Sequence, residues 1–409
     1  MGEIREDIVI VGAGISGLAT ALGLHREGLR CLVLESSECL RNTGFALSLW
    51  TNAWRALDAL GIGDHLRQHS LQNNEFQVFS ADSGLPTASV PLQLHKKNFE
   101  SRCLRRKLVL ETLNKELPQG TIRYSSKVVM IEESGLFKLV HLSDGSVIKT
   151  KVLIGCDGVN SMVAKWLGLQ SVVDSKRSAI RGFVEYPETH GYEPKFYAFF
   201  GGGVRFGFLP CDEKGLYWFC TYNQSSIPHC DQRDEHNPIK LKEFVLSKTR
   251  DVSKEVTEIL ERTPLDFISN ARLKLRLPWN VLLGDIARDN VCVAGDALHP
   301  MTPDLGQGGC SALEDSVVLA RCLGRAFSEN QRDGDDGEVF TRIKESLERY
   351  KKERRWRSFV LISTAYLMGF IQESNSKVIS YLRDNFLVHY TLRIALSMAD
   401  FDCGKLLLP

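Results

Sequence analysis

The sequence predicts an α/β protein with a Rossmann-like dinucleotide-binding domain, an inserted antiparallel-sheet domain and a C-terminal helical segment. A strand, a glycine-rich loop and a helix open the chain over Asp7–Gly28. Aromatic-rich strand patterns without an intervening helix occupy Ser178–Tyr222, and a long helical pattern runs from Val339 to about Phe370. Strands that alternate with helices are typical of a parallel sheet, whereas consecutive strands favour an antiparallel one.

The composition is that of an ordinary globular protein, and the length is sufficient for two domains. The 51 lysines and arginines nearly balance the 50 aspartates and glutamates. No basic tract is interleaved with aromatic residues, so nucleic acid is not an expected partner. The 11 cysteines lack paired CxxC spacing, which favours a reduced compartment over a disulfide framework, and no metal site is predicted.

The N-terminal apolar segment is interpreted as a strand and not as a signal peptide, because Gly12 and Gly14 interrupt it. We therefore expect an intracellular protein, with the cytoplasm as its location.

The glycine-rich loop matches the dinucleotide fingerprint GxGxxG in its full context of strand, helix, second strand and acid. In this pattern Gly12 makes the tight turn, Gly14 lets the backbone approach a pyrophosphate, and Gly17 packs the helix on the strand. Glu35 closes the second strand and is the candidate for the ribose hydroxyls; its carboxylate would repel a 2′-phosphate. The loop candidates are Gly12, Ala13, Gly14, Ile15, Ser16 and Gly17.

Between residues 41 and 118 the patterns are less regular. We expect a glycine-containing loop and a short helix over Arg41–Gly61, an exposed-edge strand at Phe76–Phe79 and a loop-rich excursion at Leu85–Asn98. Arg105 begins a helix that Pro118 terminates. Because a helix dipole disfavours cations at its N-terminus, Arg105 is either a solvated helix end or a residue that faces a phosphate.

Two further strands end on an aspartate and a glycine. The stretch Lys127–Cys156 predicts a three-stranded antiparallel meander that leads into Asp157-Gly158. Asp157 either faces a ligand or caps the following helix in an Asx-type turn. The apolar run Val291–Ala294 predicts a buried parallel strand that stops at Gly295-Asp296. A loop fixed by prolines and Gly306 then leads to a helix whose N-terminus favours negative charge.

The aromatic strands of Ser178–Tyr222 supply the candidate substrate wall. Most such aromatics are core residues, but one face of the sheet could line an apolar pocket for a planar molecule. The sequence does not say which face that is. Our candidates for substrate contact are Phe208, Tyr217 and Pro300.

The remaining patterns complete the chain. A helical stretch over Ile239–Arg262 and a strand near Ala271–Trp279 follow the aromatic sheet. In the C-terminal segment the apolar run FVLISTAYLMGFI is too short to cross a bilayer, which needs about 20 residues. We expect it to pack on the main body; contact of this run, or of FLVHYTLRIALSM, with a membrane surface is the alternative.

These patterns predict a nucleotide-binding domain in three parts, a substrate domain in two and a helical tail. The corresponding residues are 1–75, 101–177 and 281–328 for the first, 76–100 and 178–280 for the second, and 338–409 for the third.

The three glycine-containing motifs, in this order, resemble those of the group A flavin monooxygenases of the para-hydroxybenzoate hydroxylase fold. The similarity extends from about Asp7 to Arg325. The stretches AGDALHPMTPDLGQGG and SALED most resemble plant enzymes that are similar to salicylate hydroxylase and zeaxanthin epoxidase. The resemblance implies bound FAD, with the first glycine loop at its pyrophosphate and Glu35 at its ribose. It places Asp296 at the ribityl chain. Further cofactor contacts implied are Arg41, Arg105, Asp157, and the amides of Gly306, Gly308 and Gly309.

The resemblance also implies the chemistry: NAD(P)H reduces FAD, O₂ forms a flavin C4a-hydroperoxide, and a small aromatic or isoprenoid-like substrate is hydroxylated or epoxidised. No protein nucleophile or acid is nominated, and His299, a loop histidine before proline, is interpreted as structural. Two departures stand out: Ala164 occupies the usual arginine position of the second motif, with Lys165 beside it, and Gly309-Cys310 replace alanine and asparagine. A related flavoprotein reductase and a non-catalytic FAD-binding protein remain the alternatives.

Overall fold

The computed structural model describes residues 4–40, 44–81, 84–92, 99–201, 203–226, 236–249, 252–327, 335–373 and 388–406. One sheet of eight strands has the order β16-β17-β10-β1-β2-β7, and β9 and β8 continue from β10. Strands β17, β10, β1, β2 and β7 run parallel. Strand β16 pairs antiparallel with β17, β9 pairs antiparallel with β10, and β8 pairs antiparallel with β9. The bounds are β1 Ile4–Val11, β2 Leu32–Leu34, β7 Ile122–Arg123, β8 Val128–Ser134, β9 Phe137–Leu142, β10 Val147–Gly155, β16 Ala287–Arg288 and β17 Val291–Val293.

The predicted parallel core and meander are therefore present, and the mixed α/β fold class is confirmed. Helices α1 and α10 pack closely beside this sheet, and Gly23 is what permits the approach: a Cβ there would lie 2.8 Å from the Ala320 Cβ. The helices of this part are α1 Ile15–Arg26, α2 Thr51–Ala59, α3 Gly63–Arg67, α5 Arg106–Lys115, α6 Met162–Trp166, α9 Pro278–Leu283 and α10 Gly308–Ala326.

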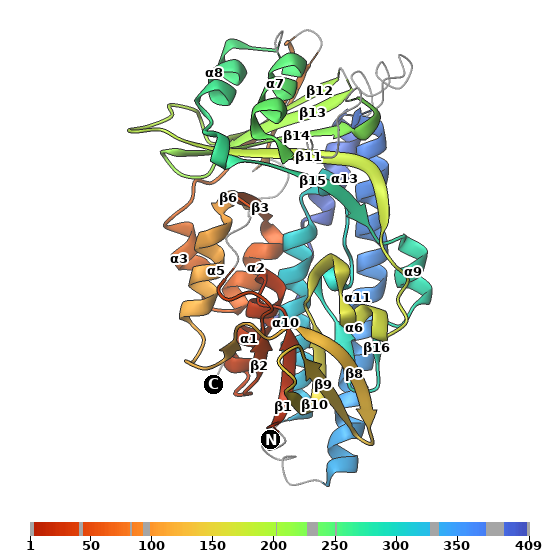
Figure 1. Cartoon of the computed structure of the whole chain (residues 1–409). Helices are drawn as coiled ribbons and strands as arrows, with labels where there is room; N and C mark the ends of the chain where they lie inside the picture. The colour runs from red at the N-terminus through yellow and green to blue at the C-terminus, as the bar shows by residue number, and fades with distance from the viewer. Residues whose placement is uncertain are drawn as a thin grey trace.

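The second large sheet has seven strands in the order β15-β11-β14-β13-β12-β4-β5. In Figure 1 it lies above the eight-stranded sheet, and α7 and α8 cover its outer face. Its strands are β4 Glu75–Ser80, β5 Pro86–Pro91, β11 Val173–Glu185, β12 Lys195–Gly201, β13 Val204–Pro210, β14 Gly215–Asn223 and β15 Ile268–Leu275; its helices are α7 Pro238–Thr249 and α8 Lys254–Arg262.

Three local expectations for these segments were wrong. Strand β4 is not an edge strand, because it pairs with β12 on one side and β5 on the other, and β5 occupies part of the predicted loop excursion. The helical stretch Ile239–Arg262 is two helices, since Ser253 caps the second by accepting a hydrogen bond from the Val256 amide. A capping serine begins a new helix because its side chain satisfies a free N–H.

The stretch Arg41–Gly61, for which a loop and then a short helix were predicted, also contains a strand that was not predicted. Strand β3, Ala46–Trp50, pairs antiparallel with β6, Ser101–Arg105, in a separate two-stranded sheet. The two strands are more than 50 residues apart in the sequence, so no short hairpin turn between them indicates that they pair.

Helix α11, Asp336–Glu373, runs along the molecule beside both sheets, and α13 spans Val388–Met398. The apolar run of α11 packs on the main body only along one side. Leu361, Ala365 and Met368 are buried against Leu305, whereas Tyr366, Leu367 and Phe370 are exposed. Among the helices in the described part of the chain, none has the length and apolar character to cross a membrane. Surface contact with a membrane stays a prediction, as do the domain boundaries.

Candidate functional site

Three motifs that lie far apart in the sequence meet at one edge of the eight-stranded sheet. Val11 pairs with Gly155, and Gly155 pairs with Val293, so β1, β10 and β17 end side by side. The residues that follow these ends are Gly12, Asp157 and Asp296. In parallel α/β sheets, ligands bind outside the carboxyl ends of the strands. This edge is therefore the candidate site.

The first glycine loop has the shape that its fingerprint requires. Gly12 has φ +101°, and a Cβ there would lie 2.5 Å from the Cys156 carbonyl oxygen. A Cβ on Gly17 would lie 1.9 Å from the Gly12 oxygen, so the start of α1 sits directly on the loop. Gly14 differs, because a Cβ there would meet no atom within 4 Å. The loop is thus closed against the protein at Gly12 and Gly17 and open at Gly14.

Glu35 is buried and braces this loop. Its Oε2 accepts a hydrogen bond from the Ala13 amide at 2.9 Å, and its Oε1 accepts one from the Ser37 amide at 2.9 Å. A carboxylate has about four acceptor positions, so ribose hydroxyls can still bind the same group. Arg41 lies outside the described residues.

Gly295 joins the third motif to the first. It has φ +60°, and a Cβ on Gly295 would lie 2.7 Å from the Ser16 Cβ. The next residue, Asp296, is the exposed member of the otherwise buried run Val291–Pro300. Its carboxyl therefore faces open space within the molecule. The surrounding protein limits its hydration and raises its pKa, although His299 and the nearby cations Arg106 and Arg181 act in the opposite direction.

The start of α10 is open in the same way. Gly306 has φ +63°, and Gln307 makes no side-chain hydrogen bond that caps the helix. A Cβ on Gly308 would meet no atom within 4 Å, whereas one on Gly309 would lie 3.2 Å from Leu47. The first amides of a helix lack intrahelical acceptors and favour an anion. Gly14 and Gly308 thus present open backbone in the two motifs that join at Gly295, which fits a long anionic ligand.

Ser161 is the N-cap residue of α6, and Asp157 binds further free amides at the start of this helix, which fits the capping interpretation. Its Oδ2 accepts hydrogen bonds from the amides of Met162 at 2.7 Å and Val163 at 3.4 Å. Its Oδ1 is buried and has no hydrogen-bond partner among the described residues, and contact with a cofactor stays a prediction. Ala164 is buried in this helix and Lys165 is exposed. The side chains of Ala164 and Lys165 therefore lie on different sides of this helix.

Arg105 pairs with the seven-stranded sheet. Its Nε donates to Asp212 at 2.8 Å, a guanidinium nitrogen lies 3.3 Å from Glu185, and the group lies over the Phe183 ring. The positive charge of Arg105 is therefore already paired with two carboxylates and does not require a phosphate as its partner. The next residue, Arg106, is the one whose charge acts on Asp296. The sequence analysis did not single out Arg106.

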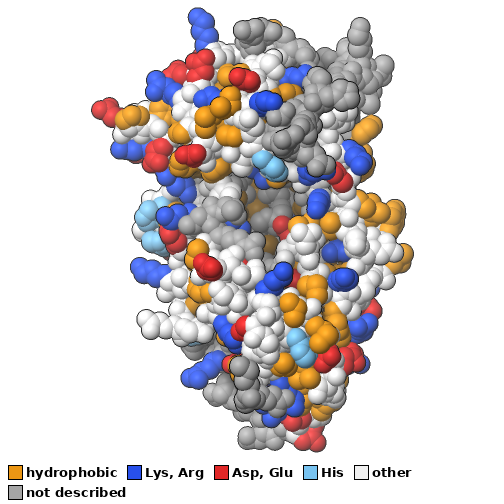
Figure 2. All heavy atoms as spheres, viewed as in Figure 1, with side chains coloured by type: hydrophobic (Ala, Val, Ile, Leu, Met, Phe, Trp, Pro, Cys, Tyr) orange, Lys and Arg blue, Asp and Glu red, His pale blue; other side chains and the backbone are white. Residues whose placement is uncertain are grey.

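The seven-stranded sheet turns one face toward this edge. Arg181, Phe183, Tyr217 and Phe219 share that face, because Arg181 pairs with Phe219 and Phe183 with Tyr217 across β11 and β14. Phe183 and Tyr217 pack with the main core, and burial raises the pKa of Tyr217 to about 12. Figure 2 shows the surface hollowed between the part with this sheet and the part below it. We call these four residues and Leu209, their neighbour on β13, the inner face.

Phe208 is not on the inner face, which corrects its prediction as a substrate contact. Its ring stacks on Tyr197, with centroids 4.4 Å apart, within the cluster that α7 and α8 cover. Neighbouring residues of a strand point to opposite faces, so Phe208 and Leu209 separate. Pro300 is buried in the Asp296 turn, and its carbonyl accepts a hydrogen bond from the Arg276 amide at 3.0 Å.

Comparison with known proteins identifies the family. Residues 5–355 match the model of the FAD binding domain. The chain belongs to this FAD-binding family. It is 51% identical over 408 residues to Monooxygenase 2 of Arabidopsis thaliana, covering 99% of both chains, and 37% identical over 405 residues to Monooxygenase 1, covering 98% and 99%. The structure of Klebsiella pneumoniae HpxO with FAD and uric acid has a TM-score of 0.82 at 22% identity, with 98% and 96% covered.

The predicted FAD-binding monooxygenase family and the fold of para-hydroxybenzoate hydroxylase are thereby confirmed. In this member of the FAD-binding family, the three motifs were predicted from the sequence, but the cations near Asp296, Arg106 and Arg181, were not. A signal for Arg181 was present: it lies two residues before Phe183 on one strand, so both share a face.

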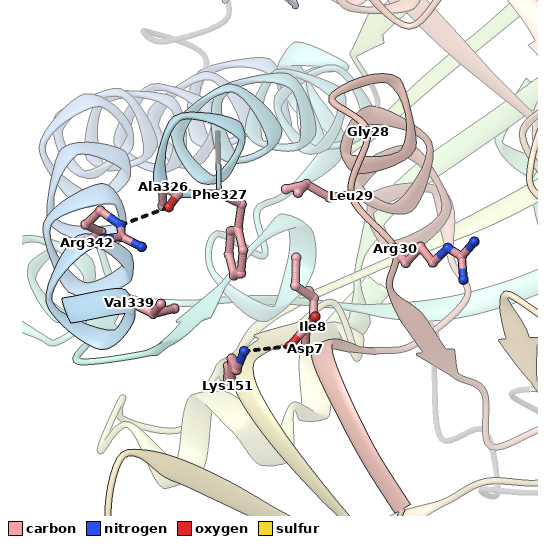
Figure 3. Close-up of a pocket in the computed structure, with 10 residues that line it drawn as sticks. All are labelled: Asp7, Ile8, Gly28, Leu29, Arg30, Lys151, Ala326, Phe327, Val339 and Arg342. Carbon is pink, nitrogen blue, oxygen red and sulfur yellow. Dashed lines mark hydrogen bonds and ion pairs between the residues drawn. The ribbon is translucent and has the colours of Figure 1, made fainter. Parts of the chain in front are cut away.

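A separate cavity of about 370 Å³ lies at the opposite end of the sheet. Figure 3 shows Phe327 and Val339 projecting toward it, with Lys151 paired to Asp7 at 3.0 Å. It is lined by Asp7, Ile8, Gly28, Leu29, Arg30, Lys151, Ala326, Phe327, Val339 and Arg342. None of the three motifs reaches it, so it is not the candidate FAD site.

Proposed function

We propose that this FAD-dependent monooxygenase hydroxylates a small planar aromatic substrate that carries a negative charge, with NAD(P)H as the reductant. The observation that carries the proposal is the position of Arg181. It lies on the aromatic inner face and its charge acts on Asp296. Among the described residues, no carboxylate lies within 4.0 Å of Arg181 to form an ion pair.

FAD fits the sheet edge on the geometry of the chain. The open backbone at Gly14 and the N-terminus of α1 would hold the pyrophosphate, Glu35 the ribose and Asp296 the ribityl chain, while the amides of Gly306–Gly309 would face the flavin ring. Bound FAD supplies the electron transfer from NAD(P)H and the activation of O₂.

The inner face would hold the substrate. Phe183 and Phe219 offer flat apolar surface, and Arg181 offers a planar group that pairs with a carboxylate or phenolate. Tyr217 lies beside Arg181, and burial raises its pKa to about 12, above a usual value at which tyrosine is already protonated at neutral pH. Its hydroxyl can therefore donate a hydrogen bond to a substrate oxygen.

The test begins with the wild-type protein reconstituted with FAD. NAD(P)H oxidation is measured with aromatic carboxylates and phenols, with their uncharged amides and ethers, and with isoprenoids, using ¹⁸O₂ to label the product. We expect acceleration and label only with the anions. Arg181→Met should raise KM about tenfold, the loss of one charged hydrogen bond. The control Arg262→Met removes an outer cation paired with Glu258 and should leave KM unchanged.

Other outcomes select the alternatives. Equal acceleration by charged and uncharged compounds refutes the proposed substrate charge, and a labelled epoxide refutes hydroxylation. Substrate reduction without O₂ consumption indicates a reductase. Retained FAD without NAD(P)H oxidation across the whole panel indicates a non-catalytic FAD-binding protein.

A further inference from the structure

Two adjacent carboxylates, Glu314 and Asp315, are fully buried in α10, and we call them the carboxylate pair. Each is bonded to a different loop of the candidate FAD site. Charged side chains are buried only when paired, because moving a charge out of water is costly.

Asp315 holds the turn that carries Asp296. Its Oδ2 accepts hydrogen bonds from the Gly295 amide at 2.8 Å and from His299 Nε2 at 2.6 Å. His299 is buried, and its Nδ1 meets no hydrogen-bond partner in the part of the chain that the structure describes. The Asp315 carboxylate can only accept, so Nε2 donates the proton of this hydrogen bond. The turn is thus fixed at Gly295 and at His299, on both sides of Asp296.

Glu314 holds the start of α10 through one intermediary. Its Oε1 accepts a hydrogen bond from Asn52 Nδ2 at 2.5 Å, and the same nitrogen donates to Gln307 Oε1 at 2.8 Å. Gln307 lies between Gly306 and Gly308. The anchored side chain of Gln307 therefore holds the chain next to the open backbone of Gly308.

Both carboxylates are held by one residue of the C-terminal helix. Arg354 of α11 has no exposed surface; its Nε donates to Asp315 at 2.6 Å, and its second guanidinium nitrogen lies 2.7 Å from Glu314. Arg357, one turn later, donates to Glu314 at 2.8 Å. Two cations thus balance two anions. Because a well-packed apolar cluster can be equally stable, this arrangement is better explained by the geometry it specifies.

We propose that α11 is a positioning element for the cofactor: Arg354 fixes the carboxylate pair, and the pair fixes the Gly295–His299 turn and the Gln307 loop. This inference rests on the proposed function, in which those two loops bind the ribityl chain and the flavin ring. Asp315 and Asn52 are positioning residues, since each acts through a loop.

The experiment compares Asp315→Asn and Asn52→Leu with the wild-type protein reconstituted with FAD. The readouts are the dissociation constant of FAD and the visible spectrum of the bound flavin. We expect Asp315→Asn to raise the dissociation constant about tenfold, which corresponds to one charged hydrogen bond. Asn52→Leu should shift the flavin absorption band with a smaller change in affinity, because it disturbs the loop at the ring.

The control is Glu353→Gln, which removes an ion pair between the same two helices at their partly exposed side: Arg321 lies 2.8 Å from Glu353. It should change neither readout. If Asp315→Asn does not fold, Ser311→Ala replaces it. The Ser311 hydroxyl contacts both His299 and Arg354, and its removal does not leave a buried charge without a partner. This variant should also weaken FAD binding.

The outcomes separate the two proposals. A wild-type protein that takes up no FAD overturns the proposed function and this inference with it. If the wild-type protein binds FAD and the folded variants match it in both readouts, or if Glu353→Gln changes them equally, the positioning role of the carboxylate pair is overturned, and with it that of α11, while the proposed function stands.

Discussion

The carboxyl edge of the eight-stranded sheet and the inner face of the seven-stranded sheet form the two sides of the candidate site, and they are built differently. At the edge, backbone geometry decides: Gly12 and Gly17 leave no room for a Cβ, and Gly295 touches Ser16. On the inner face, side-chain alternation decides, so Tyr217 lies inside and the neighbouring Trp218 lies outside. At the edge only a few residue types fit, and their spacing in the sequence is fixed, whereas many residue types fit on the inner face.

The largest effect is expected from substitutions on the two faces of the seven-stranded sheet. Phe208→Ala should lower the free energy of unfolding by about 3–5 kcal/mol, the cost of emptying a buried phenylalanine site, and leave substrate KM unchanged. Tyr217→Phe should cost about 1 kcal/mol at most and lower the substrate-dependent rate, because it removes the hydroxyl beside Arg181. Denaturant unfolding and steady-state kinetics measure both. Reversed effects would mean that the assignment of faces is wrong.

Two glycines of the first loop separate folding from binding. Gly12→Ala places a Cβ 2.5 Å from a backbone oxygen at φ +101°; overpacking costs about 1–3 kcal/mol and the left-handed backbone about 1–2 kcal/mol. We expect lower stability and no bound FAD. Gly14→Ala meets no atom within 4 Å, so the apoprotein should keep its unfolding temperature while FAD affinity falls. An unchanged FAD dissociation constant for Gly14→Ala would argue against a pyrophosphate at Gly14.

The same contrast explains what the sequence could predict. Gly12, Gly295 and Asp296 follow strand ends at spacings that local chemistry imposes, so the edge and its family were recognisable from the residues alone. Whether Phe208 or Tyr217 faces the site depends on which face α7 and α8 cover, and that is set by packing between distant segments. Strand β3 was missed for the same reason, because its partner β6 is distant in the chain.

The carboxylates that connect these regions should make the protein sensitive to acid. Asp304 pairs with Arg177 at 2.8 Å and Arg205 at 3.1 Å, which links β11 and β13 to the loop before α10. Burial alone would raise its pKa, but its hydrogen bonds to Arg177 and the charges of both arginines outweigh burial and lower it. The pKa values of Glu314 and Asp315 are lowered in the same way: burial acts to raise them, and it is outweighed by Arg354 and Arg357 at Glu314 and by His299 and Arg354 at Asp315.

A lowered carboxyl pKa contributes stability that is complete above the ordinary value of about 4 and is lost as the pH falls through the folded-state pKa. The free energy of unfolding should therefore decline below about pH 4, by up to about 1.4 kcal/mol per pH unit for each carboxylate. Urea titrations from pH 7 to 2 measure this. The slope should change little with added salt, because the pairs are buried; stability that rises on acidification would contradict the assignment.

Asp296 should show the opposite sign and the smallest effect. Limited hydration raises its pKa, so the ionised carboxylate weakens the fold, and this penalty grows as the pH rises from the ordinary value toward the folded-state pKa. Asp296→Asn should raise the unfolding temperature of the apoprotein at pH 7 by an amount on the order of 1–2 °C, and the gain should vanish at acid pH. With FAD added, the order should reverse, because the wild-type protein gains more from binding. A variant that is less stable than the wild-type apoprotein would show that Asp296 serves the fold and not the ligand.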